Sequence, residues 1–266
     1  MNKASLKNIL RSIGIIRISD NFRYQLMRIR NKDDNKKFLN ENPNIAIPPD
    51  YLLYEAHQLK YRSYINNGLA NAKYIKGLLE KYIDFNNKKV LDWGCGPARI
   101  IRHFPNLLQN TKFYASDYNK RSILWNQNNI DNITFSTNGI FPPTCFEDDF
   151  FDVIYGLSIL THLSAENHFK WINELYRISK ENAVLLLTTH GEAYKEKLIK
   201  KDQLKFESNQ LVIEGNTLEG HRTFAAYHPP KRIKSMFEDK FKVLEHIPGK
   251  KESWGTSQDQ WILEKL

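Results

Sequence analysis

The chain has few cysteines and no long apolar run. Its 266 residues include only Cys95 and Cys145, which excludes a disulfide framework and a cysteine-based zinc cluster. No stretch approaches the ~18 apolar residues that a membrane-spanning helix needs. The first residues also do not resemble a secretory signal. Hydrophobic residues make up 41% of the chain, enough for a packed core. We therefore expect a cytoplasmic globular protein.

Acidic residues are scarce at the start of the chain. Residues 1–40 hold ten Lys/Arg and three Asp, which accounts for most of the net charge of +9. Apolar residues recur there every three or four positions, as on one face of a helix, at Leu6, Ile9, Leu10, Ile13 and Ile16. Such a helix can lie on an anionic membrane surface at the inner face of the membrane, contact a partner, or pack on its own protein or in a homodimer. Because the rest of the chain is nearly neutral, nucleic acid is not the expected partner.

Strand-like and helix-like segments alternate after residue 87. Apolar runs predict strands at 88–94, 112–117, 132–137, 150–156, 182–190, 241–247 and 258–266. Helical patterns lie at 98–109, 119–128 and 165–179. This order predicts an α/β fold, a seven-stranded, mostly parallel sheet in which the last strand is antiparallel.

Three regions are expected along the chain. Residues 1–50 form a basic N-terminal arm, residues 51–87 a tyrosine-rich helical cap or lid, and residues 88–266 the main domain. Within that domain, residues 191–240 exceed a plain crossover and contain a hairpin pattern around Gly215-Asn216, so we expect an insertion that covers the substrate.

The first expected strand of the sheet runs into a glycine-rich turn, WGCGPAR at 93–99. A strand, a glycine turn and a helix form a nucleotide-type site, and an acid that ends the next strand, Asp117, can bind a ribose. Arg99 replaces the third glycine of the dinucleotide pattern, which disfavours NAD. Asp92 would repel a pyrophosphate but attract a ligand with ammonium and sulfonium groups. The turn therefore favours S-adenosylmethionine (SAM).

Several segments resemble the motifs of class I SAM-dependent methyltransferases in the family's order. They are VLDWGCGPARI, YASDYN, FSTNGIFPPTCFEDDFFDVIYGLSILTHLS, ELYRISKENAVLLLTTHG and QDQWILEKL. The resemblance covers about 88–266 and implies a Rossmann-like class I methyltransferase fold with an N-terminal helical extension. With IPPDYLLYEA and AAYHPP included, the chain is more loosely similar to bacterial methyltransferases of polysaccharide-biosynthesis type.

The resemblance implies roles for individual residues. At the methionine end of SAM it places Asp92, Gly94, Cys95, Gly96 and Leu157. At the ribose and adenine it places Asp117, Tyr118, Asn138 and Gly139. The chain departs from the family at Ala98 and Arg99, where a glycine is commoner.

The positions that follow the fourth and fifth strands carry histidines rather than metal-binding carboxylates or an Asn-Pro-Pro-Tyr motif. Imidazole suits proton abstraction. We therefore expect a metal-independent enzyme with His190 or His162 as the base, Glu192 as an orienting or acting carboxylate, and His228 as a further candidate. The favoured substrate is a hydroxyl of a small molecule or glycan precursor. An RNA or protein methyltransferase and a non-catalytic scaffold remain alternatives.

Overall fold

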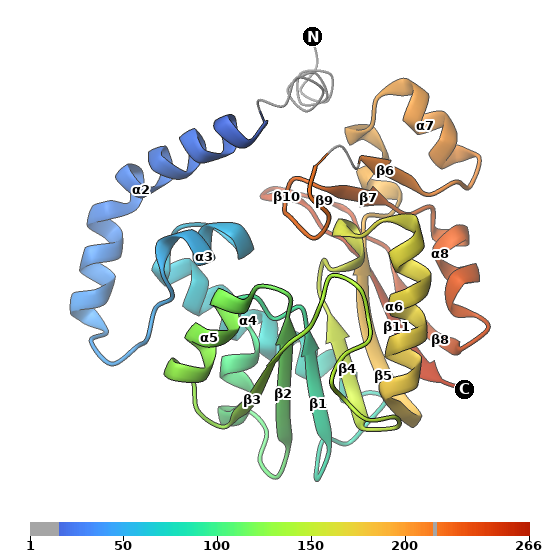
Figure 1. The fold of residues 1–266 in the computed structure, drawn as a ribbon, viewed down its shortest axis with the longest axis horizontal. Coiled ribbons are helices and arrows are strands. Elements are labelled where there is room, and N and C mark those ends of the chain that lie inside the picture. The colour runs from blue at the N-terminus through green and yellow to red at the C-terminus, as the bar shows by residue number, and fades with distance from the viewer. Residues whose placement is uncertain (1–15, 215–216) are drawn as a thin grey trace. The chain divides into compact units, whose positions relative to one another are not determined.

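A computed structural model describes residues 16–214 and 217–266. Its main sheet has seven strands in the order β3-β2-β1-β4-β5-β11-β8 (Figure 1). The strands are β1 (Lys89–Trp93), β2 (Lys112–Asp117), β3 (Ile133–Thr137), β4 (Phe151–Gly156), β5 (Ser179–Thr189), β8 (Phe241–Ile247) and β11 (Asp259–Lys265). Strand β11 runs antiparallel to both β5 and β8, whereas β1, β2 and β3 pair in parallel, as do β4 and β5. The predicted fold class is confirmed.

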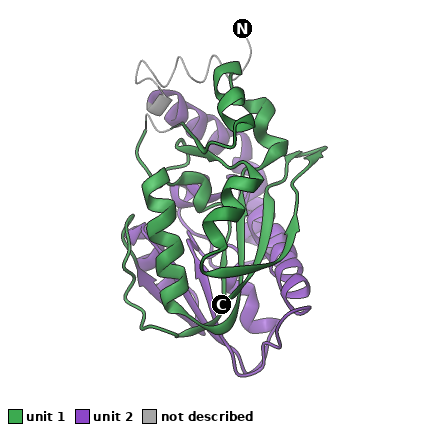
Figure 2. Ribbon diagram, turned by 90° about the vertical axis from the view of Figure 1, so that its right-hand side faces the viewer, with its two compact units in different colours: residues 1–14, 138–266 green, residues 15–137 purple. Residues whose placement is uncertain are grey.

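The chain divides into two compact units, one that ends at Thr137 and one that runs from Asn138 to Leu266 (Figure 2). The first unit contains β1–β3 and the helices α2 (Ile16–Glu41), α3 (Asp50–Ala56), α4 (Tyr61–Leu79) and α5 (Lys120–Asn129). The second contains the other strands of the sheet and the helices α6 (Ala165–Ile178), α7 (Lys200–Glu207) and α8 (Pro230–Phe237). None of the described helices is long and apolar enough to cross a membrane.

The N-terminal region differs from the expected pattern in two ways. Helix α2 continues through the polar stretch 31–41, which carries no clear helical signal. Residues 57–60 separate α3 from α4, so the helical region expected at 51–87 contains two helices rather than one. Tyr54 and Tyr64 are both buried, and Tyr64 packs with leucines of the same unit. The predicted apolar stripe at Leu6, Ile9, Leu10 and Ile13 lies outside the described residues.

The helix expected at 98–109 is mostly absent. Only a short 3-10 helix, η1 (Ile101–Asn106), forms there, and it contains Pro105. Ala98 has a left-handed backbone with φ 57°, which a right-handed helix cannot include. Turn residues therefore occupy the first part of the predicted helix.

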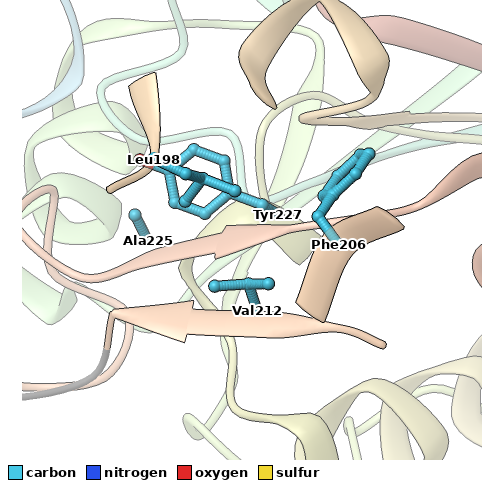
Figure 3. Close-up of a cluster of buried hydrophobic side chains, with 5 residues drawn as sticks. All are labelled: Leu198, Phe206, Val212, Ala225 and Tyr227. Atoms are coloured by element: carbon cyan, nitrogen blue, oxygen red, sulfur yellow. The ribbon is translucent and has the colours of Figure 1, made fainter. Parts of the chain in front are cut away.

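The insertion has a small core of its own. It contains η3 (Glu192–Lys197), α7, the antiparallel pair β6 (Val212–Glu214) and β7 (Ala225–Tyr227), and α8. Five buried apolar side chains form the core, namely Leu198, Phe206, Val212, Ala225 and Tyr227 (Figure 3). The predicted hairpin is present, but Glu214 pairs with Ala225, so its connection is longer than the two residues Gly215-Asn216. A second small ribbon joins β9 (Lys251–Glu252) and β10 (Gly255–Thr256).

Candidate functional site

The glycine turn after β1 is held against the end of β2 by its own backbone. The N–H groups of Gly94 and Cys95 both donate to the carbonyl of Ser116, at 2.8 and 3.0 Å. Gly94 and Gly96 have φ of 80° and 51°, a conformation in which glycine avoids the steric cost of a Cβ. The turn therefore presents bare backbone, as close approach of a ligand requires.

Asp117 lies at the end of β2 and connects this turn to the start of α5. Its Oδ2 accepts a hydrogen bond from the Gly96 N–H, and its Oδ1 accepts one from the Asn119 N–H, both at 2.8 Å. The side chain is buried, and burial raises the pKa of Asp117 to about 6, with a further increase from Glu55 that the two N–H bonds oppose. Each carboxylate oxygen keeps a second lone pair. The group can therefore accept two ribose hydroxyls once it is ionised.

Helix α3 packs beside the same turn. The sequence predicted no particular residue for this contact. The Glu55 carboxylate accepts a hydrogen bond from Asn119 Nδ2 at 3.2 Å. A Cβ added to Gly96 would lie 3.3 Å from the Ala56 Cβ. The signal for this contact was the segment IPPDYLLYEA, but its spacing does not reveal which side chains reach the turn.

Three other predicted residues of the first unit lie on these elements. Asp92 is the fourth residue of β1 and is 5% exposed. Burial raises the pKa of the Cys95 thiol, which therefore stays protonated and serves as turn structure rather than as a nucleophile. Tyr118 is partly exposed, and burial of its hydroxyl raises its pKa to about 12.

The remaining predicted cofactor residues belong to the second unit. Asn138 donates from Nδ2 to the Gly139 carbonyl at 2.7 Å, and its buried Oδ1 has no hydrogen-bond partner among the described residues. A buried acceptor of this kind suits an exocyclic amine. Gly139 has no room for a side chain, because a Cβ would lie 2.8 Å from the Phe141 carbonyl oxygen. Leu157 is half-buried directly after β4.

His162 and His190 are held in the same way. Nδ1 of His162 donates to the Phe224 carbonyl at 2.8 Å, and Nδ1 of His190 donates to the Ala226 carbonyl at 3.0 Å. A carbonyl can only accept, so each neutral ring carries its proton on Nδ1 and its basic lone pair on Nε2. Both side chains are half-buried, and His190 also stacks on Tyr194 with 4.1 Å between ring centroids. The insertion thus fixes the tautomer of both rings.

His228 and Glu192 have other partners. His228 is completely buried, its Nε2 lies 2.8 Å from Nε2 of His168, and its backbone N–H donates to the His190 carbonyl. Burial lowers the pKa of His228 well below its usual value. Glu192 forms an ion pair with Lys195 at 2.5 Å. His228 therefore supports the strand that carries the carbonyl of Ala226, and Glu192 is exposed on η3.

A polar network at the ends of β4 and β5 was not predicted. The Ser158 N–H donates to Thr188 Oγ1, which donates to the Gln258 side chain, and Gln258 donates back to Ser158 Oγ. Ser158 has a left-handed backbone with φ 66°, so this network stabilises a strained turn directly after β4. Within the described residues, no group of three or more His, Cys, Asp or Glu side chains could hold a metal ion.

An open α/β sheet with a glycine turn after its first strand and an acid after its second defines a nucleotide-type site of the Rossmann class. The sequence pattern of the methyltransferase-domain family matches residues 84–261. The chain belongs to this family and is a class I SAM-dependent methyltransferase, as the motifs predict. No curated protein matches the sequence.

Solved structures with the same fold share little sequence with this chain. A SAM-dependent methyltransferase from Methanosarcina mazei has a TM-score of 0.55 and 16% identity over 71% of this chain and 97% of that one. The magnesium protoporphyrin IX methyltransferase of Synechocystis, solved with bound SAH (S-adenosylhomocysteine), has a TM-score of 0.55 and 13% identity over 90% and 98%. A methyltransferase from Listeria monocytogenes described as SAM-dependent has a TM-score of 0.55 and 13% identity over 74% and 99%. These likenesses concern the fold.

Proposed function

We propose that the protein methylates a hydroxyl oxygen of a small molecule or glycan precursor, without a metal ion, and that a histidine removes the hydroxyl proton. The observation that carries this proposal is the shared anchoring of His162 and His190 through Nδ1. Two rings with a fixed tautomer follow two neighbouring parallel strands, β4 and β5, at their carboxyl ends. Ligands of open α/β folds bind at that edge.

The residues of the first unit fit SAM. The backbone of Gly94 and Gly96 leaves room for the methionine part, Asp117 accepts the ribose hydroxyls and Tyr118 packs on adenine. Asn138 belongs to the second unit, and its buried Oδ1 is the group proposed to accept from the adenine amino group. When bound, SAM would supply a methyl group attached to a positively charged sulfonium, and the in-line transfer of that group would break the sulfur–methyl bond and leave neutral S-adenosylhomocysteine.

The acceptor side supplies the base. As the acceptor oxygen forms its bond to the methyl carbon, the hydroxyl proton passes to Nε2 of His190 or His162. The ring is then an imidazolium, and the carbonyl at its Nδ1–H stabilises the positive charge. Of the two, we favour His190, because Tyr194 stacks on it and limits its rotation.

Incubation with methyl-labelled SAM and fractionated cell extract tests the proposal. We expect the label in an ether-type product that resists mild base. His190→Ala or His162→Ala should abolish most of it, whereas His221→Ala, a half-buried histidine of the same insertion, is the matched control. Label in RNA or protein would instead support the alternative function, an RNA or protein methyltransferase that uses the basic N-terminal residues.

We also propose that residues 1–40 bring the protein to an anionic surface, such as the inner face of a membrane. Their ten basic and three acidic residues support this contact. A surface-bound enzyme would meet acceptors that are themselves linked to lipid. The charge alone does not determine which side chains make the contact.

A further inference from the structure

Helix α2 has two apolar faces, and among residues 18–214 and 217–266 only one of them packs against other parts of the protein. Tyr24 and Met27 contact the cluster of Leu53, Leu59 and Tyr64, and Phe38 is buried further along the same face. The opposite face carries four large apolar side chains that are exposed to solvent. They are Ile18 (70% exposed), Phe22 (66%), Leu26 (51%) and Ile29 (75%).

The spacing of these four residues forms one stripe. They recur after four, four and three positions, and 3.6 residues per turn place them within about a quarter of the helix circumference. A run of exposed large apolar residues on one helix face is unusual for a surface that meets only water. The stripe therefore needs an apolar environment.

Basic side chains border the stripe on both sides. At 3.6 residues per turn, Arg23 and Arg30 lie along one border and Arg28 and Lys32 along the other, and all four are exposed. Arg28 also pairs with Asp50 at 3.2 Å. Between Ile18 and Lys32 the one acidic residue, Asp20, faces inward and accepts a hydrogen bond from the Tyr54 hydroxyl at 2.8 Å. The outward face of this segment thus carries positive charge alone.

We propose that this outer face of α2 binds an anionic lipid surface, with Ile18, Phe22, Leu26 and Ile29 among the acyl chains and the basic borders at the headgroups. An apolar stripe between cationic borders is the form of a helix that lies in a membrane interface. A second copy would bring two positively charged borders together, which disfavours a dimer through this face. The inference rests on the proposed contact of residues 1–40 with an anionic surface and assigns it to particular side chains.

Flotation of the full chain with vesicles tests this assignment. We expect binding to phosphatidylcholine vesicles with 30 mol% phosphatidylglycerol, weaker binding in high salt, and little binding to phosphatidylcholine alone. Phe22→Ser with Ile29→Ser should weaken the binding by about tenfold or more, because two apolar anchors are lost. Arg23→Glu with Arg30→Glu should weaken it by a similar factor and remove the preference for anionic lipid. Leu124→Ser, which alters an equally exposed leucine on α5, is the matched control and should bind as the wild type does.

The outcomes separate this inference from the proposals on which it rests. If the wild type floats and both double variants float equally well, the α2 assignment is wrong although the N-terminal contact stands. If the wild type does not float, both fail. If the variants change a dimer to a monomer in sedimentation without vesicle binding, the stripe is a self-association surface and the lipid proposal is overturned. SAM affinity of the same proteins, measured by titration, is expected to be unchanged, so cofactor binding is judged independently of the lipid contact.

Discussion

The two compact units provide their candidate functional groups by different means. In the unit that ends at Thr137, the groups are the bare backbone of the glycine turn and the Asp117 carboxylate, and hydrogen bonds between segments that follow neighbouring strands hold them. Asp117, for example, contacts Gly96 and Asn119. In the unit from Asn138 onward, the groups are imidazoles, and the carbonyls that fix them lie 62 and 36 residues further along the chain. The groups proposed for the ribose are thus local to two neighbouring strand ends, whereas the proposed acceptor site depends on an insertion that folds around its own core.

The largest effect is expected on turnover, when a histidine of the second unit is replaced. Replacing the true base among His190 and His162 by alanine should lower turnover by about 10²–10⁴-fold, the usual worth of general-base catalysis. Steady-state rates at saturating SAM, measured with an identified acceptor, check this. Wild-type rates in both single variants would show that alignment alone accounts for the rate.

A smaller effect is expected on cofactor binding. Asp117→Ala should weaken SAM affinity by about 1.5–3 kcal/mol, the usual loss of hydrogen bonds to a charged group. Calorimetric titration measures it, with NAD as a ligand that should not bind. Tight NAD binding by the wild type would contradict the assignment of the glycine turn.

The pH dependence of SAM affinity tests the role proposed for the Asp117 carboxylate. In the proposed function its carboxylate form accepts the ribose hydroxyls. Burial raises the pKa of Asp117 to about 6, so we expect SAM affinity to fall as the pH is lowered through 6. Glu55→Gln removes a charge that raises this pKa, and the midpoint of the profile should move to lower pH. A flat profile between pH 7 and 5 would mean that another group binds the ribose.

The smallest effect is expected at Ala98. Its φ of 57° costs an L-residue about 1–2 kcal/mol, which Ala98→Gly relieves, but the variant also loses a buried methyl worth roughly 0.8 kcal/mol and gains chain entropy in the unfolded state. Chemical denaturation should show a change in the free energy of unfolding below about 1 kcal/mol. A loss above about 2 kcal/mol would show that the methyl packing dominates.

The sheet was largely predictable, because each strand corresponds to a run of apolar residues that is visible in the local sequence. The segments predicted at 112–117 and 241–247 coincide with β2 and β8. The long α2 was not predictable, because its second half is stabilised by distant bonds. Asn35 Nδ2 donates to the Leu59 carbonyl, and Asn35 Oδ1 accepts from the Tyr61 N–H, both across more than twenty residues.

The candidate site was predictable only in part for the same reason. The turn at Gly94 and Gly96 and the acid Asp117 follow their strands directly, so strand ends locate them. The contact of Glu55 with Asn119, 64 residues apart, and the network of Ser158, Thr188 and Gln258 have no local signature. The burial of His228 likewise depends on His168, which lies on another element.

The central claim is that Asp117 of the first unit binds SAM, whereas His190 of the second unit acts on the acceptor. Calorimetric titration of SAM into the wild type, Asp117→Ala and His190→Ala side by side tests this claim most directly. We expect the wild type to bind, His190→Ala to bind about equally well, and Asp117→Ala to bind at least ~10-fold more weakly. Equal affinity in Asp117→Ala, or a comparable loss in His190→Ala, would contradict the account.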